Sequence, residues 1–281
     1  MGYQVRFGPA GIPIQCKGTS TIDGIRCCKE LGLNAMEMEF VHGVRMTLET
    51  AKEAKKTANE SDVWLSSHAP YYINLCSDEK SENSKRNIIE SARITAAAGG
   101  KITVFHPGYY QKKDSETAFQ TAKKHLKEIE EDLKSHNIKI VLGAETVGKK
   151  TAFGGLKENI RLSRELTMVA PVIDFAHLIA RGDFRLRTKE DYRAVFDLIE
   201  NEINGYSMHF HSHFSEINYN EKGERNHVPL DERNEPPYRP LIELIKENGY
   251  SGVIICESPK IDFDAIKMRN YYAKVGDGHV D

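Results

Sequence analysis

The sequence predicts a single-domain (β/α)₈ barrel, the TIM-barrel fold, spanning residues 1–281. Short apolar runs alternate with amphipathic stretches along the whole chain, without a linker or low-complexity segment between them. The length of 281 residues is close to the roughly 250 residues typical of such barrels. The first apolar run leads into Gly8-Pro9-Ala10-Gly11, which is not the G-x-G-x-x-G turn of a dinucleotide-binding open sheet. A closed barrel is therefore favoured over a doubly wound sheet.

Each expected strand is short and rich in β-branched or other apolar residues. We expect strands at Tyr3–Phe7, Ala35–Phe40, Val63–Ser67, Ile102–Phe105, Ile138–Ala144, Val169–Ile173, Tyr206–Phe210 and Val253–Cys256. The stretches between them repeat apolar residues every three or four positions, which is typical of surface helices. Such helices are expected at Ser84–Ala98, Ser115–Lys134 and Lys189–Asn201, among others.

Composition limits the class of protein. The formal net charge is -2, so any attraction for a polyanion must come from local groups of cations. The five cysteines form no C-x-x-C pair and are odd in number, which argues against a disulfide framework. No apolar run approaches the roughly 20 residues of a membrane-spanning helix. We expect a cytoplasmic monomer that does not bind membranes.

Six consecutive expected strands end at or beside a residue of a metal-binding type, and the ends of such strands are where barrels of this kind carry out chemistry. These residues are His68 in SSHAP, His106 in VFHPG, Glu145 in GAET, Asp174 in VIDFAH, His209 in MHFH and Glu257 in CESP. Imidazole and carboxylate groups bind Zn²⁺ where no thiolate is used, and carboxylates that converge on one rim repel each other without a cation. The pattern predicts a metal site, with zinc expected and manganese as the alternative.

Two further histidines extend this set beyond one ion. His177 follows Asp174 by three residues, and His227 lies in the long loop after the seventh expected strand. Taken singly, a strand-end histidine is more often a hydrogen-bonded core residue, and Glu145 or Glu257 could cap a following helix; the recurrence across six strands favours metal binding. The segment H-F-H-S-H places alternate residues on one face of a strand, so His211 is a rival to His209, and His42 and His213 remain open.

The motifs H-A-P-Y-Y-I-N, F-H-P-G, A-E-T-x-G, I-D-x-x-H, M-H-F and C-E-S occur in this order over nearly the whole chain. In this order they resemble the endonuclease IV family of DNA-repair apurinic/apyrimidinic endonucleases, within the wider xylose isomerase-like barrel superfamily. The resemblance implies a zinc-dependent hydrolase that cuts the phosphodiester 5′ to an abasic site in duplex DNA. It also implies three ions: one bound by His68, His106 and Glu145, a second by Glu145, Asp174, His209 and Glu257, and a third by His177 and His227.

The chain departs from the family pattern at three places. The opening strand reads R-F-G-P-A-G and lacks the family's usual histidine. Arg225 stands where the family motif D-x-H has its aspartate, and Glu224 is a candidate substitute. The second expected strand carries Glu37 and Glu39, where the family is mostly apolar. The third ion and the substrate specificity are the properties that these departures affect.

Catalytic and DNA-binding residues follow from the same resemblance. Several close divalent ions suit phosphodiester hydrolysis, with Glu145 bridging two ions and Glu257 orienting the attacking water. Basic loops around the strand ends suit a DNA backbone, and an aromatic side chain after His68 suits stacking at an abasic gap. The expected DNA contacts are Tyr71, Tyr72, Arg45, Lys149, Arg181 and Arg225, although surface loops are commonly basic and Tyr72 could equally pack in the core.

The alternative function is that of a sugar isomerase or epimerase of the same superfamily. Such enzymes resemble this chain in the quartet Glu145, Asp174, His209 and Glu257, which binds one ion and uses two glutamates for proton transfer. A one-metal isomerase does not require the additional histidines His68, His106, His177 and His227. A third possibility is a catalytically silent barrel that binds metal or DNA, for which fewer than two ions per chain would be expected.

Overall fold

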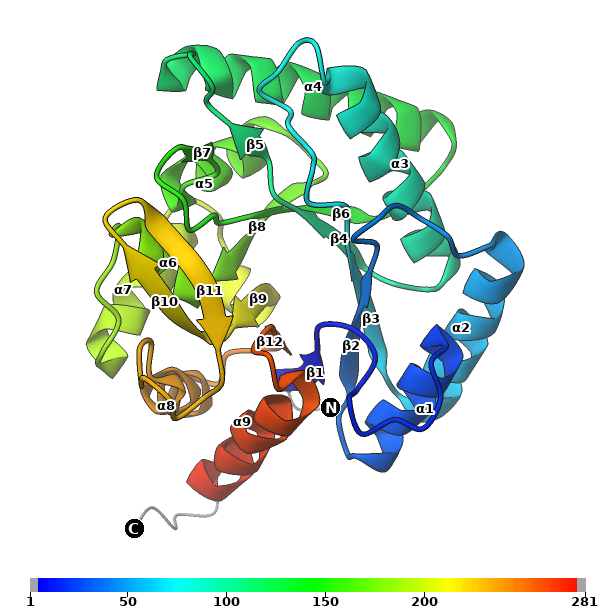
Figure 1. Cartoon of the computed structure of the whole chain (residues 1–281), viewed down its shortest axis with the longest axis vertical. Coiled ribbons are helices and arrows are strands. Elements are labelled where there is room, and N and C mark those ends of the chain that lie inside the picture. The colour runs from blue at the N-terminus through cyan, green and yellow to red at the C-terminus, as the bar shows by residue number, and fades with distance from the viewer. Residues whose placement is uncertain (1–4, 277–281) are drawn as a thin grey trace.

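The computed structural model describes residues 5–276, which form eight parallel strands in a nearly closed barrel with helices around it (Figure 1). Along the barrel the strand order is β1-β12-β9-β8-β6-β4-β3-β2. The circle closes between the edge strands β1 and β2, where the Asn34 amide donates to the Phe7 carbonyl at 3.2 Å and the Gly11 amide to the Glu37 carbonyl at 2.9 Å. The strands are β1 Val5–Pro9, β2 Ala35–Glu39, β3 Trp64–His68, β4 Ile102–Phe105, β6 Val141–Glu145, β8 Val169–Asp174, β9 Phe210–Phe214 and β12 Gly252–Cys256.

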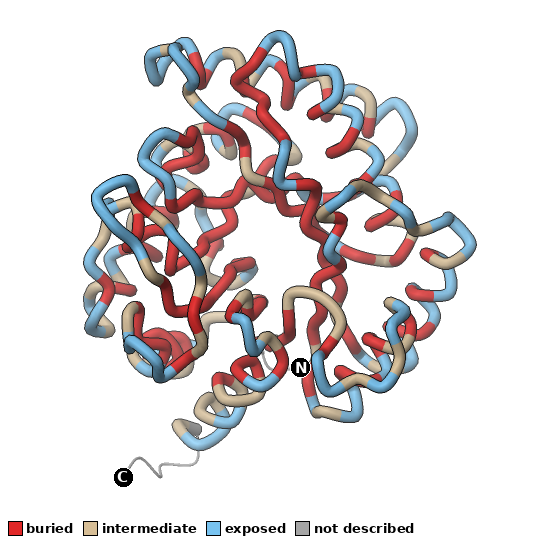
Figure 2. The backbone as a smooth tube through the Cα atoms, viewed as in Figure 1, coloured by how far each residue is buried: buried red, intermediate tan, exposed pale blue. Residues whose placement is uncertain are grey.

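The helices surround the barrel, and along them buried stretches alternate with exposed ones (Figure 2). Most of the buried helix residues are apolar and belong to the core. They are α1 Thr21–Glu30, α2 Leu48–Ser61, α3 Ser81–Ala97, α4 Ser115–Ser135, α5 Leu156–Glu165, α6 Phe175–Arg181, α7 Lys189–Glu200, α8 Tyr238–Asn248 and α9 Ile261–Gly276. Side chains that accept the third backbone amide of the helix fix several starts, for example Thr47 at α2, Asp114 at α4 and Thr188 at α7. Among the described residues, no helix is both long and apolar enough to cross a membrane.

Alternation along the strands separates two environments. In β2, Met36 and Met38 pack outward into the large core beneath the helices. Inside the barrel, small apolar clusters of side chains such as Val104 and Ile255 are joined by Trp64. A polar layer lies beside them in the barrel interior: Glu37, Ser66, His211 and His213 are all buried.

Two short antiparallel pairs stand on the carboxyl ends of the barrel strands, a rim that we call the mouth. These pairs are β5 Gly108–Tyr109 with β7 Ala152–Phe153, and β10 Glu216–Asn220 with β11 Gly223–Val228. The loop between β6 and β7 is bound to the β10–β11 hairpin, because Lys149 forms a bridge with Gly223 and the Glu224 amide donates to the Gly148 carbonyl at 3.2 Å. These segments therefore form one connected structure above the barrel.

The predicted (β/α)₈ barrel is confirmed, and most strands lie within a few residues of their expected positions. Tyr3, the start of the first expected strand, lies outside the described residues. The seventh strand was predicted wrongly: Tyr206–Met208 is a 3₁₀ turn (η1), and the strand is Phe210–Phe214. The Glu200 carboxylate accepts the amides of Gly205 and Ser207, at 2.6 and 2.9 Å, and Gly205 has a φ of 79°. This turn delays the strand by four residues.

Candidate metal centre

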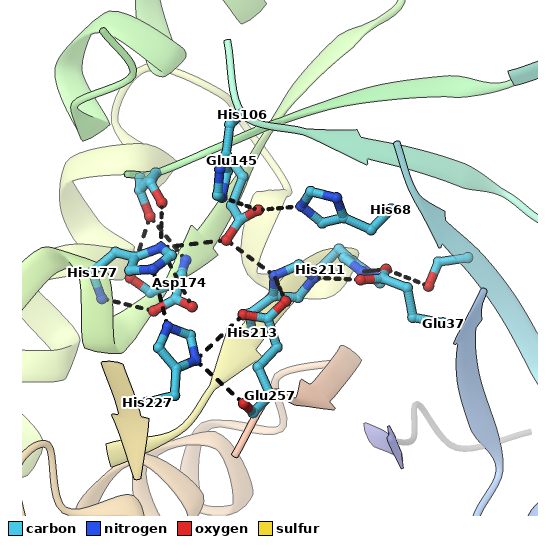
Figure 3. A network of polar contacts seen from close by, with 12 residues as sticks. Glu37, His68, His106, Glu145, Asp174, His177, His211, His213, His227 and Glu257 are labelled. Atoms are coloured by element: carbon cyan, nitrogen blue, oxygen red, sulfur yellow. Dashed lines mark hydrogen bonds and ion pairs between the residues drawn. The ribbon is translucent and has the colours of Figure 1, made fainter. Parts of the chain in front are cut away.

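Glu145, at the end of β6, is the centre of a buried cluster of histidines and carboxylates inside the mouth (Figure 3). Its Oε2 lies 2.9 Å from Nε2 of His68 and 3.1 Å from Nε2 of His106. Its Oε1 lies 3.1 Å from Nδ1 of His213 and 3.4 Å from Nδ1 of His177. The two oxygens of one carboxylate thus face two different sets of imidazoles.

Among the described residues, potential ligand atoms form four groups in which the atoms lie within 4.8 Å of one another, and three of these groups share carboxylates. The first ligand group is His68, His106 and Glu145; the second is Glu145, Asp174, His213 and Glu257; the third is Asp174, His177 and His227. Glu145 belongs to the first and second groups, and Asp174 to the second and third. The arrangement suits neighbouring cations bridged by shared carboxylates.

Asp174 shows how the backbone directs a ligand atom. It ends β8 and caps α6, because its Oδ1 accepts the backbone amide of His177 at 2.7 Å. This bond fixes the carboxylate and leaves Oδ2 in the cluster, buried and without a hydrogen-bond donor among the described residues. Glu145 Oε1 is also buried without a hydrogen-bond donor in the described part of the chain. Buried oxygens that lack a donor fit a cation.

The histidine tautomers point to the same conclusion. Nδ1 of His68 donates to the Ala69 carbonyl at 2.7 Å, and Nδ1 of His177 donates to the Thr146 carbonyl at 2.9 Å. In the neutral ring this leaves the lone pair on Nε2, which faces the cluster. Nε2 of His177 also lies 3.1 Å from Nε2 of His227, so two lone pairs would oppose each other unless a proton or a cation lies between them.

Without ions, the cluster binds protons tightly. Burial lowers the pKa of His68, but the hydrogen bond and charge of Glu145 outweigh this and raise it to about 10. Burial raises the pKa of Glu257 well above its usual value, and the nearby carboxylates Glu145 and Asp174 raise it further. Divalent cations would satisfy the same carboxylates and take the place of the protons on the imidazoles.

The departure from the D-x-H motif at Arg225 lies next to the third ligand group. The carboxylate of Glu224 lies 3.4 Å from Nε2 of His177, on the side that His227 also faces. Arg225 is exposed, and no ion pair joins it to any described residue. Glu224 is therefore close enough to supply the carboxylate that the residue at position 225 does not.

The structure places His209 elsewhere, and this corrects the predicted ligand set. His209 is exposed just before β9, at the amino-terminal end of the strand, whereas His213 lies beside Glu145 and Glu257. His211, the rival considered above, points into the barrel interior and contacts Glu37. Sequence reasoning identified the H-F-H-S-H segment but placed its register four residues too early.

The expected DNA contacts surround this cluster unevenly. Tyr71 and Tyr72 follow β3 and are 52% and 48% exposed. Arg45, Lys149 and Arg225 are exposed as well. Arg181 is different: its side chain is only 11% exposed, and it donates to the carbonyls of Lys149 and Ala152 at 2.8 Å each. It holds the β6–β7 loop in place, and its contact with DNA remains a prediction.

Comparison with known proteins identifies the family. Residues 25–274 match the family model described as xylose isomerase-like TIM barrel. The chain belongs to this family. It is 37% identical over 269 residues to an uncharacterized protein of Methanocaldococcus jannaschii, MJ0133, and the match covers 95% of this chain and 96% of that protein. The family is enzymatic, and its members bind metal ions.

Solved structures of two activities resemble the chain equally well. A D-tagatose 3-epimerase-like protein has a TM-score of 0.70 at 19% identity, covering 96% of this chain and 98% of that one. Endonuclease IV from Thermus thermophilus has a TM-score of 0.70 at 16% identity, covering 95% of this chain and 99% of that one. At such identities the likeness shows the shared fold alone, so the side chains of the mouth must distinguish the activities.

Proposed function

We propose that this member of the xylose isomerase-like family is a metal-dependent endonuclease that hydrolyses the phosphodiester 5′ to abasic sites in duplex DNA. One observation carries the proposal: three ligand groups lie side by side and share Glu145 and Asp174. Adjacent divalent ions suit phosphodiester hydrolysis, because both the attacking and the leaving oxygen need charge stabilisation. We expect zinc, with manganese as the alternative, and two or three ions per chain.

The protein's own residues have distinct roles in this proposal. Bound ions would supply Lewis acidity and lower the pKa of a water molecule. Glu145 is fully buried and cannot reach solvent, so its role is to hold the first and second ligand groups at a fixed separation. The side chain of Glu257 is 18% exposed, which allows it to accept a hydrogen bond from the attacking water. His177 and His227 would hold an ion that neutralises the leaving group.

DNA binding would use the surface around the mouth. The exposed rings of Tyr71 and Tyr72 are 6.5 Å apart, with planes at 83°, so one can stack in an abasic gap while the other lies edge-on to it. Arg45, Lys149 and Arg225 offer exposed cations to phosphates, although the net charge is -2. We propose that the protein acts in the cytoplasm as a monomer.

A sugar isomerase or epimerase is the second candidate, and the second ligand group favours it specifically. Glu145, Asp174, His213 and Glu257 could together hold one ion, and two glutamates would then be available for proton transfer at a sugar carbon. The similarity to the D-tagatose 3-epimerase-like protein agrees with this reading. The first and third ligand groups favour the nuclease, because a one-metal isomerase has no use for them.

The deciding experiment uses a fluorescently labelled duplex with one tetrahydrofuran abasic-site analogue and a matched duplex without the lesion. Purified protein should nick only the first duplex, on the 5′ side of the lesion, and a chelator should stop the reaction. A panel of ketoses is incubated in parallel and analysed for interconversion. Sugar epimerisation without nicking would replace the proposal by the isomerase, and neither activity in zinc-loaded or manganese-loaded protein would reject both.

A further inference from the structure

Glu37 is a buried acidic residue of β2, and it lies beside His211 at one side of the metal centre (Figure 3). Barrel interiors are usually filled by branched apolar side chains, so a buried carboxylate here needs a reason. Its Oε2 accepts the Ser66 hydroxyl at 2.6 Å and Nε2 of His211 at 3.2 Å. Its Oε1 lies 2.9 Å from Nε2 of His213. The surrounding residues thus hold one oxygen and direct the other at His213.

The two nitrogens of His213 face opposite ways. Nδ1 lies 3.1 Å from Glu145 Oε1 and 3.1 Å from Glu257 Oε1, within the second ligand group. Nε2 faces Glu37. Among the described residues no hydrogen bond joins Nε2 to Glu37 Oε1, so the contact is one of charge at 2.9 Å. A carboxylate only accepts hydrogen bonds, so Glu37 would stabilise a ring proton on Nε2, and the Nδ1 lone pair would then be available for a cation.

This arrangement distinguishes His213 from the other histidines. His68 and His177 are held by backbone carbonyls, at Ala69 and Thr146, and present Nε2 to the centre. His213 presents Nδ1 and is held by a charged group. Carboxylate partners of this kind fix the tautomer of a metal-binding histidine, orient its ring and increase its basicity.

We propose that Glu37 is a positioning residue for the metal centre: its carboxylate orients His213 and holds it in the Nε2-protonated tautomer, which tightens cation binding by the second ligand group. Ser66 and His211 stabilise the carboxylate in turn, and His211 is itself held by stacking on Trp64, with ring centroids 5.3 Å apart. The inference rests on the metal centre of the proposed function, whichever substrate that centre serves.

Another arrangement of the same atoms is a further cation bound directly by Glu37, His211 and His213, whose ligand atoms also lie within 4.8 Å of one another. It would require His213 to bind cations through both nitrogens and therefore to lose its ring proton. A charge contact between Glu37 and a His213 ring that is protonated on Nε2 needs no such loss. The protonation state of His213 distinguishes the two arrangements.

The test compares wild-type protein with the isosteric variant Glu37→Gln. Glu53→Gln is the control, because Glu53 is an exposed residue of α2 on the helical layer and no ion pair joins it to any described residue. Zinc and cobalt affinities are measured by competition with a chromogenic chelator. Long-range ¹H–¹⁵N spectra of histidine-labelled, zinc-loaded protein report which nitrogen of His213 carries the proton.

We expect Glu37→Gln to bind one ion about 10- to 100-fold more weakly, with the other ions unchanged. In wild-type protein the His213 Nε2 proton should be present and shifted downfield, and in the variant it should move upfield. Glu53→Gln should match wild type in both measurements. Circular dichroism confirms folding, and the wild-type spectrum tests the tautomer even if the variant does not fold.

Two results would overturn the role of Glu37 alone: unchanged ion affinities in Glu37→Gln, or a wild-type His213 without a proton on Nε2. Wild-type protein that binds no divalent ion would overturn the metal centre as well, and with it the proposed function. Failure of the inference and failure of the proposed function are therefore separate outcomes.

Discussion

Glu145 and His213 reach the metal centre from strands of the barrel, whereas His227 reaches it from the β10–β11 hairpin. The first two are fixed by strand register and lie fully buried, while the side chain of His227 is 17% exposed. The departure at Arg225 occurs on the hairpin side. The barrel therefore fixes the first and second ligand groups, whereas the third depends on an appended segment that can vary in sequence without disturbing the fold.

The largest effect on turnover is expected for a substitution of Glu145, which belongs to both ligand groups that the barrel strands position. Glu145→Gln should lower turnover at least about 1,000-fold, because two ligand groups lose a shared charge. Nicking kinetics on the lesion duplex and metal analysis by mass spectrometry measure this, and a circular dichroism spectrum like that of wild type controls for folding. Substantial remaining turnover would remove Glu145 from the mechanism.

Loss of a ligand from the β10–β11 hairpin should lower turnover less than loss of Glu145. His227→Ala should leave two ions bound and lower turnover by about 100-fold, which corresponds to ~2.7 kcal/mol. Metal stoichiometry is the sharper measurement, because it separates the third ligand group from the other two. His136, an exposed histidine on the helical layer, gives the control variant His136→Ala, which should match wild type. If His227→Ala still bound three ions, the third ion would not depend on the hairpin.

Glu224 and Arg225 sharpen the comparison within the hairpin. Glu224→Gln should weaken binding of the third ion roughly tenfold, because its carboxylate lies 3.4 Å from Nε2 of His177. Arg225→Ala should leave ion binding unchanged and reduce the salt dependence of DNA binding by about one phosphate contact. Chelator competition and fluorescence anisotropy at several salt concentrations measure the two effects. Weaker ion binding in Arg225→Ala, together with unchanged ion binding in Glu224→Gln, would contradict these roles of the two residues.

The smallest effect concerns metal-free protein. Although burial lowers the pKa of His68, Glu145 raises it to about 10 from 6.5. A raised histidine pKa gives stabilisation that is complete below about pH 6.5 and is lost as the pH rises through about 10. The melting temperature of chelator-treated protein should therefore fall by at least about 3 °C between pH 7 and 10. Scanning calorimetry measures the melting temperature at each pH. If the melting temperature of His68→Gln fell equally over this pH range, groups other than His68 would cause the pH dependence.

The sequence allowed prediction of the barrel and of most ligands, because each depends on local pattern. In β2, the alternation A-M-E-M-E marks two faces, and His68 and Glu145 each stand at the end of an apolar run. His213 could not be placed, because three alternating histidines leave the register undetermined. The turn that sets the register uses the Glu200 carboxylate, whose bonds to Gly205 and Ser207 are not visible in a hydrophobic pattern. The role of Glu37 depends on partners such as His211, 174 positions away.

The bonds between the β6–β7 loop and the β10–β11 hairpin have a consequence for recognition. Lys149 lies in this loop and is bridged to Gly223, while Arg181 binds its carbonyl from below. The backbone that carries this cation is therefore already ordered before any phosphate arrives. Little chain entropy remains to be lost on association, and the hairpin that carries His227 would move with the loop as a rigid body.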